Sequence, residues 1–153
     1  MKIYIASDHA GYELKAKLID HLESKGFEVE DCGPFKYDPS DDYPDFIYPC
    51  SLRVSEGKPG VTFGIVIVAS GQGEAICANK AKGIRAAVYY GGDLDIIKKS
   101  KEHNNANVLS LGAKFLSVDD AKKAVDLWLT EKFPGEERHR RRIEKIAEIE
   151  EEG

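Results

Sequence analysis

This chain of 153 residues has few cysteines and no long apolar run, which are the features that mark disulfide frameworks, zinc sites and membrane-spanning helices. The three cysteines, Cys32, Cys50 and Cys77, are odd in number and show neither CxxC nor zinc spacing, which indicates reduced thiols of a cytosolic protein. No apolar run approaches the length that crosses a membrane, and polar residues follow the short N-terminal apolar run too soon for a signal peptide. We therefore expect a cytoplasmic protein without a membrane partner, and the sequence reveals no metal site.

Neither sign of charge is in enough excess to indicate a polyanionic or polycationic partner. The 22 Lys and Arg against 27 Asp and Glu give a net charge of -5. This balance provides no global attraction to nucleic acid, so any anionic ligand must be bound by a local cluster. The chain also lacks internal repeats and Pro/Gly/Ser linkers, and its 42% hydrophobic content is enough for one core. We expect a single domain over residues 1–153.

Apolar runs alternate with amphipathic segments along the chain, which is typical of an α/β protein. The run at 63–68 contains only apolar residues and glycine, as expected for a parallel strand buried on both faces. We therefore predict a Rossmann-like three-layer sandwich with a five-stranded parallel sheet and a C-terminal helix. The expected strands are 2–6, 27–31, 63–68, 84–90 and 107–111. The expected helices are 11–25, 44–56, 75–81, 92–102, 118–130 and 136–151.

A glycine turn, Ser70-Gly71-Gln72-Gly73-Glu74, joins the third expected strand to a short helix. Backbone N–H groups at such a turn point toward one place, which suits an anion or a developing oxyanion. Glu74 falls in the first helical turn, where the positive end of the helix dipole favours its ionised form. A carboxylate base beside amide donors suggests proton abstraction next to a carbonyl. The alternative is that the dipole alone accounts for an acidic residue at this position.

A nucleotide site is a second alternative for the glycine turn. The dinucleotide pattern GxGxxG needs glycine or alanine where Ile76 stands, and this turn follows the third expected strand rather than the first. The P-loop pattern GxxxxGK[ST] does not occur. The lone GxG therefore supports a nucleotide only weakly.

Three of the four histidines have different expected roles. Asp8 and His9 end the first expected strand, and two titratable groups at a strand's carboxyl end suit acid–base chemistry. Asp8 has the alternative role of a helix cap. His103 lies just before the fifth expected strand, where a surface position at a helix end is the simpler interpretation. His21 lies within an amphipathic helix, and we expect it to be structural.

Four arginines surround His139 at the start of the last expected helix: Arg138, Arg140, Arg141 and Arg142. Basic residues at a helix N-terminus oppose the dipole and repel one another. The cluster therefore calls for a counter-anion, and guanidinium groups suit phosphate. Positions 138 and 142 share one helix face. A phosphate monoester is the simplest ligand, and a solvated charged face is the alternative.

Seven motifs lie in order along nearly the whole chain: Ser-Asp-His-Ala-Gly-Tyr at 7–12, Asp-Tyr-Pro at 42–44, Ser-Gly-Gln-Gly-Glu at 70–74, Ala-Asn-Lys at 78–80, Gly-Ile-Arg-Ala at 83–86, His-Asn-Asn-Ala-Asn at 103–107, and Arg-His at 138–139 with Arg142. Together they closely resemble the ribose-5-phosphate isomerase B family, which includes galactose-6-phosphate isomerase subunits. Many members carry a cysteine base where this chain has Val68. The chain resembles the branch with a glutamate in the following turn, which Glu74 matches. Ser70 stands where most members have threonine, and Lys114 replaces a common arginine.

The resemblance implies a sugar-phosphate isomerase without a metal or other cofactor, in which Glu74 moves the proton between C2 and C1. It implies ring opening by His103 with help from Asp8. Ser70 and the amides of Gly71 and Gly73 would hold the negative oxygen. A non-catalytic receiver or nucleotide-binding module is the rival from another class.

The resemblance also implies how the substrate is bound. His9, Arg138 and Arg142 would bind the phosphate, while Tyr43 and Asn104 would contact the sugar. Ribose 5-phosphate is the expected substrate, and tetrose or hexose phosphates such as galactose 6-phosphate or allose 6-phosphate are the alternatives. Family members build this site across a subunit interface, so we expect a homodimer or a dimer of dimers.

Overall fold

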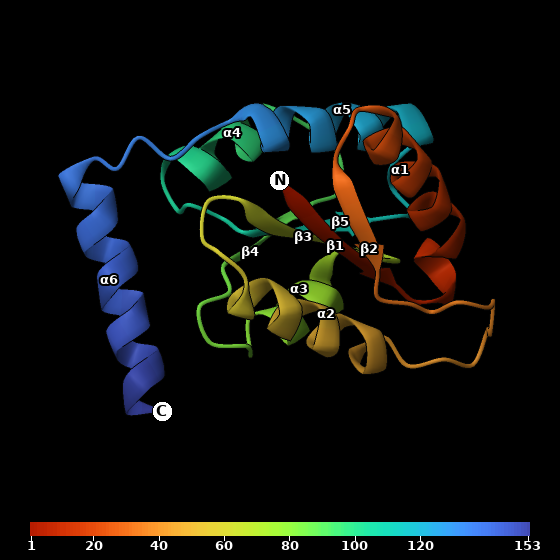
Figure 1. The fold of residues 1–153 in the computed structure, drawn as a ribbon, viewed down its shortest axis with the longest axis horizontal. Helices are drawn as coiled ribbons and strands as arrows, with labels where there is room; N and C mark the ends of the chain where they lie inside the picture. The colour runs from red at the N-terminus through yellow and green to blue at the C-terminus, as the bar shows by residue number, and fades with distance from the viewer.

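The computed structural model describes residues 1–153 and contains one parallel sheet with the strand order β2-β1-β3-β5-β4 (Figure 1). This sheet confirms the predicted α/β fold with five parallel strands. The strands are β1 (Lys2–Ser7), β2 (Glu28–Asp31), β3 (Thr62–Val68), β4 (Ala86–Tyr89) and β5 (Val108–Gly112).

Helices cover both faces of the sheet and complete the predicted three layers (Figure 1). On one face lie α1 (Tyr12–Ser24), α4 (Asp95–Glu102) and α5 (Val118–Thr130), and on the other lie α2 (Pro44–Glu56) and α3 (Gln72–Ala78). The 3-10 turn η1 (His9–Gly11) precedes α1, and α6 (Glu137–Glu152) ends the chain. None of the helices has the length and apolarity needed to cross a lipid bilayer.

The central strand β3 contributes to two cores, because successive residues of a strand face opposite sides of the sheet. Ile65 and Ile67 pack in the core beneath α1 and α5. Val66 and Val68 pack in the core beneath α2 and α3. All residues of β3 are buried, which explains why the sequence shows a continuous apolar run here rather than an alternating one.

Three expected elements begin at other residues, each for a local reason. The helix expected at 75–81 begins earlier, at Gln72, because Gly71 with a φ of 84° makes the turn into it. The strand expected at 84–90 begins at Ala86, whose N–H group donates to the side chain of Asn79 at 2.8 Å. The helix expected at 92–102 begins at Asp95, because the two glycines before it have positive φ angles. Among the other elements, the helices expected at 44–56 and 118–130 have the expected bounds, and the rest differ by one residue at one or both ends.

The connections after β1 and β3 make a topological switch point at the carboxyl ends of these two strands. The strands are neighbours, and the chain leaves them toward opposite faces through α1 and α3. Ligands of open α/β sheets bind at such a switch point. By contrast, α6 stands apart from the layers (Figure 1), and His139 is its one buried residue.

Candidate active site

The loop after β1 holds two of the expected site residues at the switch point. The carboxylate of Asp8 caps η1, because its Oδ1 accepts the N–H groups of Ala10 at 2.8 Å and Gly11 at 3.3 Å. The capping role considered for Asp8 is thus confirmed. The Nδ1 atom of His9 lies 3.8 Å from Oδ2 of Asp8 and 2.7 Å from Oδ1 of Asp41. The capped carboxylate therefore also faces the imidazole.

Asp41 is a site residue that the sequence analysis missed. Its hydrogen bond raises the pKa of His9, and the negative charges of Asp8 and Asp41 add to this effect. The positively charged imidazolium of His9 therefore persists to higher pH than usual. For Asp8, burial raises the pKa against the backbone N–H donors that favour its charged form. No sequence signal marks Asp41, because 32 positions separate it from His9.

The same three side chains form the cluster that is most suited to a metal ion. Asp8, His9 and Asp41 offer one ligand atom each, and these atoms lie within 4.8 Å of one another. The 2.7 Å separation between His9 and Asp41 is the length of a charge-assisted hydrogen bond. A shared proton therefore accounts for this contact without an ion.

Glu74 lies at the start of α3, where it is fully buried. Its Oε2 accepts the N–H group of Val68 at 2.5 Å, and its Oε1 is buried without a hydrogen-bond partner. Burial raises the pKa of Glu74 to about 7, against the backbone N–H groups of Glu74, Val68 and Gly71, which lower it. The stabilisation of the ionised form expected at a helix N-terminus is thus outweighed by desolvation. The carboxyl group changes its charge near neutral pH.

Tyr43 and the glycine turn lie together beside Glu74. A Cβ atom added to Gly73 would lie 2.6 Å from the Oη atom of Tyr43, so this tyrosine packs directly on the turn. The Oγ atom of Ser70 is 3.4 Å from the N–H group of Gln72 that donates to it. Because the Gly71 amide lowers the pKa of Glu74, this donor already interacts with the carboxylate. The chain therefore brings together Asp8, His9, Tyr43, Ser70, Gly71, Gly73 and Glu74.

The remaining expected site residues lie at the opposite end of the sheet. His103 follows α4 and precedes β5, so it belongs to the amino ends of the strands, whereas Glu74 lies beyond the carboxyl end of β3. These two strands pair in parallel from Gly64 and Val108 to Val68 and Gly112. Four steps of about 3.3 Å along the strands separate the two ends by roughly 13 Å or more. One chain therefore does not bring His103 and Glu74 together.

The second group is centred on two stacked imidazoles. The rings of His103 and His139 are nearly parallel, with centroids 4.2 Å apart and an angle of 16°. Desolvation lowers the pKa of His139, and the positive charges of His103 and Arg138 lower it further. The sequence analysis did not assign a role to His139. Its burial within a run of arginines is the feature that marks it.

Within the arginine run, two members have local partners and two share the predicted face. Arg141 pairs with Glu137 at 2.7 Å, and the guanidinium of Arg140 donates to the carbonyl of Gly135. Arg138 is exposed, donates from Nε to Nε2 of His139 at 3.4 Å, and has only a long carboxylate contact, 3.6 Å to Glu136. Arg142 is exposed and belongs to no ion pair of the structure. These two guanidinium groups are therefore the ones most available to an external anion.

Comparisons with known proteins identify the family of this chain. The model of the Ribose/Galactose Isomerase family matches residues 3–146. A ribose-5-phosphate isomerase B of Mycobacterium tuberculosis is 41% identical over 150 residues, which cover 98% of this chain and 90% of that protein. The structure of ribose-5-phosphate isomerase B from Mycoplasma genitalium with bound ribulose-5-phosphate has a TM-score of 0.93 and 39% identity, covering 99% of this chain and 97% of that one.

A second solved structure gives the same result. Ribose-5-phosphate isomerase B of Clostridium thermocellum has a TM-score of 0.91 and 44% identity, and 99% of each chain is covered. Both the family model and these full-length relatives agree with the resemblance that the sequence motifs carry. This chain therefore belongs to the ribose/galactose isomerase family.

Proposed function

We propose that this protein interconverts ribose 5-phosphate and ribulose 5-phosphate through a cis-enediolate, with Glu74 as the base. The observation that carries this proposal is a buried carboxyl group at the switch point of a chain in this family. Its pKa of about 7 suits a group that must take a proton from C2 and return it to C1, because the ideal catalytic pKa lies near the working pH. The unpartnered Oε1 of Glu74 is the atom available for this transfer.

Donors of the glycine turn stabilise the negative oxygen of the enediolate in this mechanism. The Ser70 hydroxyl and the Gly73 amide act together with the Gly71 amide, which also interacts with the base. Removing one such donor typically costs about 10²- to 10³-fold in rate. Tyr43 packs on Gly73 and would contact the sugar from there. We propose that no metal or other cofactor takes part, so the reaction should proceed with a chelator present.

The phosphate group is bound by three cationic side chains in this proposal. Asp41 holds Nδ1 of His9, which leaves Nε2 free to donate to a phosphate oxygen. Arg138 and Arg142 lie four residues apart on one face of α6 and lack a close carboxylate partner. His103 opens the sugar ring with help from Asp8, and Asn104 contacts the sugar.

We propose that a complete site needs two copies of the chain. The group at the carboxyl ends of the strands contains Glu74, and the group at the amino ends contains His103 and the phosphate-binding arginines. Because roughly 13 Å or more of sheet separates them, the second group of one subunit would complete the first group of its partner. The exposure of Ile146 and Ile149 on α6 supports an interface there. The assembly is a homodimer or a dimer of dimers, and we place it in the cytoplasm, in keeping with its three free cysteines.

The reaction is tested by following the conversion of ribose 5-phosphate to ribulose 5-phosphate with a chelator present. Glu74→Gln should lower turnover by about 10²- to 10⁴-fold while substrate binding is largely kept. The matched control is Glu13→Gln, which changes an exposed glutamate in the first turn of α1. A Glu74→Gln enzyme with a near-normal rate would show that another group is the base.

The shared site is tested by mixing two inactive variants. Glu74→Gln and Arg138→Ala/Arg142→Ala are unfolded and refolded together, so that about half of the dimers contain one subunit of each kind. One of the two sites in such a mixed dimer has both wild-type groups, so about a quarter of the wild-type activity should return. Recovery is absent if each chain forms its own complete site.

A hexose phosphate is the second candidate substrate, because the family to which the chain belongs is named for galactose as well as ribose. The proposed phosphate-binding residues and the base suit four-, five- and six-carbon aldose phosphates alike. The preference among these substrates therefore depends on contacts to the rest of the sugar. Measuring kcat/KM over a panel of such phosphates decides between them. Inactivity toward every member would favour the non-catalytic receiver or nucleotide-binding module instead.

A further inference from the structure

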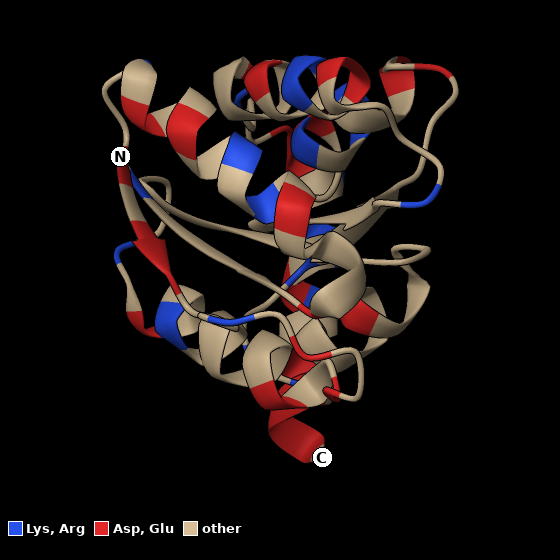
Figure 2. Cartoon of the chain, turned by 90° about the vertical axis from the view of Figure 1, so that its right-hand side faces the viewer, with Lys and Arg blue, Asp and Glu red and all other residues tan.

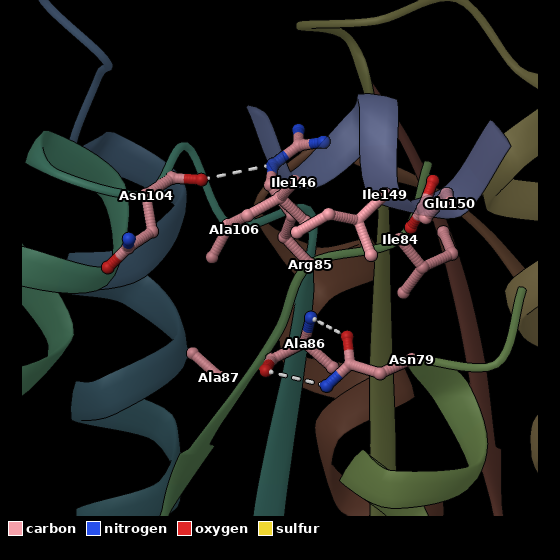
Figure 3. A pocket seen from close by; sticks show the side chains of 10 residues that line it. All are labelled: Asn79, Ile84, Arg85, Ala86, Ala87, Asn104, Ala106, Ile146, Ile149 and Glu150. Carbon is pink, nitrogen blue, oxygen red and sulfur yellow. Dashed lines mark hydrogen bonds between the residues drawn. The ribbon is translucent and has the colours of Figure 1, made fainter. Parts of the chain in front are cut away.

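We infer that Arg85 is a positioning residue for His103, acting through the turn that follows α4. The inference builds on the ring-opening role proposed for His103. Arg85 lies in the segment before β4, in the wall of a groove of about 530 Å³ between that strand and α6. Figure 3 shows its guanidinium group directed at the carbonyl oxygen of Asn104.

The guanidinium group of Arg85 bonds to carbonyl oxygens from two segments of the chain. Its Nε is 3.0 Å from the carbonyl oxygens of both Asn104 and Asn105, and its Nη2 is 2.9 Å from that of Asn105. Its Nη1 donates to the carbonyl of Gly83 at 3.2 Å. The planar fork therefore joins the turn after α4 to the segment before β4.

The side chain of Asn107 also binds the segment before β4. Its Oδ1 accepts the backbone N–H group of Arg85 at 2.8 Å, and its Nδ2 donates to the carbonyl of Gly83 at 2.9 Å. Asn105, which lies in the turn held by Arg85 and Asn107, has a φ of 47°, which is uncommon for a residue other than glycine. The turn is thus held in a conformation that its own backbone does not strongly favour.

The chemistry of these contacts selects arginine. Burial lowers the pKa of Arg85, and the negative charge of Glu150 opposes this effect. No carboxylate lies within ion-pair distance of the guanidinium, so an ion pair does not explain this half-buried charge. The carbonyl oxygens require several donors in one plane, which a guanidinium group supplies and an ammonium group does not. Without this side chain, the partly buried carbonyls of the turn would lose their partners.

The anchored turn carries the residues that face the proposed substrate. His103 directly precedes Asn104, and its ring stacks on His139 at 4.2 Å. Releasing the carbonyls of Asn104 and Asn105 frees the backbone that sets the position of this ring. A misplacement of about 1 Å can cost on the order of 100-fold in rate. Arg85 does not touch the reacting atoms, so its effect should appear only in the step that His103 performs.

The test uses two measurements that separate ring opening from proton transfer. Isomerisation of ribose 5-phosphate starts from a closed ring, whereas ribulose 5-phosphate is open-chain and exchanges its C1 proton with heavy water through the enediolate alone. Arg85→Met should lower kcat for ribose 5-phosphate by about 10- to 100-fold. KM and the exchange rate of ribulose 5-phosphate should change by less than about threefold, because the base and the phosphate clamp remain.

Matched variants control for stability and folding. Ile84→Ala removes a buried neighbour of Arg85 in the same segment and should lower thermal stability without the selective loss of kcat. Arg85→Lys keeps the charge and most of the stem but loses the fork, so it should show the same selective loss at smaller size. It also keeps the inference testable if Arg85→Met does not fold.

Combining variants decides whether Arg85 acts through His103. Arg85→Met/His103→Ala should be no slower than His103→Ala alone, because the second change removes the group that the first one displaces. Additive losses, or equal losses of isomerisation and exchange, would overturn the positioning role. If His103→Ala itself isomerises ribose 5-phosphate normally, the proposed role of His103 fails first and the inference falls with it.

Discussion

Replacing Glu74 by glutamine should make the fold more stable at alkaline pH while it removes the proposed base. Burial raises the pKa of Glu74 from an ordinary value of 4.5 to about 7. At about 1.4 kcal/mol for each pH unit, this gap corresponds to about 3 kcal/mol. The folded protein therefore holds this proton more tightly than the unfolded chain. The cost of ionising Glu74 is absent below pH 4.5, grows between pH 4.5 and 7, and is complete above pH 7.

Glutamine remains neutral at every pH and therefore escapes this cost. The free energy of unfolding of Glu74→Gln, minus that of the wild type, should rise by about 2.5 kcal/mol between pH 5 and pH 8. Any constant effect of the substitution, such as a change in the bond from Val68, cancels in this comparison. Urea unfolding of both proteins at the two pH values, at one fixed protein concentration, measures it.

An exposed glutamate provides the control for this experiment. Glu13 also lies in the first turn of a helix but is solvent-exposed, so Glu13→Gln should show no comparable rise. If the stability difference for Glu74→Gln is the same at pH 5 and pH 8, burial does not raise the pKa of this carboxyl group. The proposed match between its pKa and the working pH would then be wrong.

Three further outcomes follow from contacts of the site. The kcat/KM of the wild type should rise with pH through about 7 as Glu74 ionises, and a flat profile between about pH 6 and 8 would contradict this. Gly73→Ala should lower both turnover and melting temperature, because the added Cβ would lie 2.6 Å from Oη of Tyr43; normal values for both would mean that Tyr43 moves aside freely. Asp41→Asn removes the main cause of the raised pKa of His9. The imidazolium should then deprotonate at lower pH, and an NMR titration of His9 should show a lower midpoint. An unchanged midpoint would contradict this explanation.

Much of the fold could be predicted because burial on both faces leaves a direct trace in the sequence. The run at 63–68 is continuous and apolar for this reason, and it forms the central strand β3. Element ends were harder to predict, because they depend on contacts from elsewhere in the chain. The side chain of Asn79, for example, binds both the N–H and the C=O group of Ala86 at the start of β4. No local pattern around residues 84–86 reveals this bond.

The candidate site could be predicted only residue by residue. The motifs name Glu74 and His103, but the raised pKa of Glu74 depends on its burial, and the pairing of His9 with Asp41 depends on the path of a long loop. One signal for the separation of the two groups was present in the sequence. His103 precedes an expected strand and Glu74 follows one. In a parallel sheet, these two positions lie at opposite ends of the strands.

The placement of the proposed catalytic groups at opposite strand ends of one sheet has a consequence for how the activity responds to dilution. In the proposed assembly an isolated subunit carries only half of each reaction centre, so specific activity should fall once the protein concentration drops below the dissociation constant of the pair. The rate per molecule would then report association directly. Substitutions of the exposed isoleucines of α6 would abolish the activity by separating the two copies.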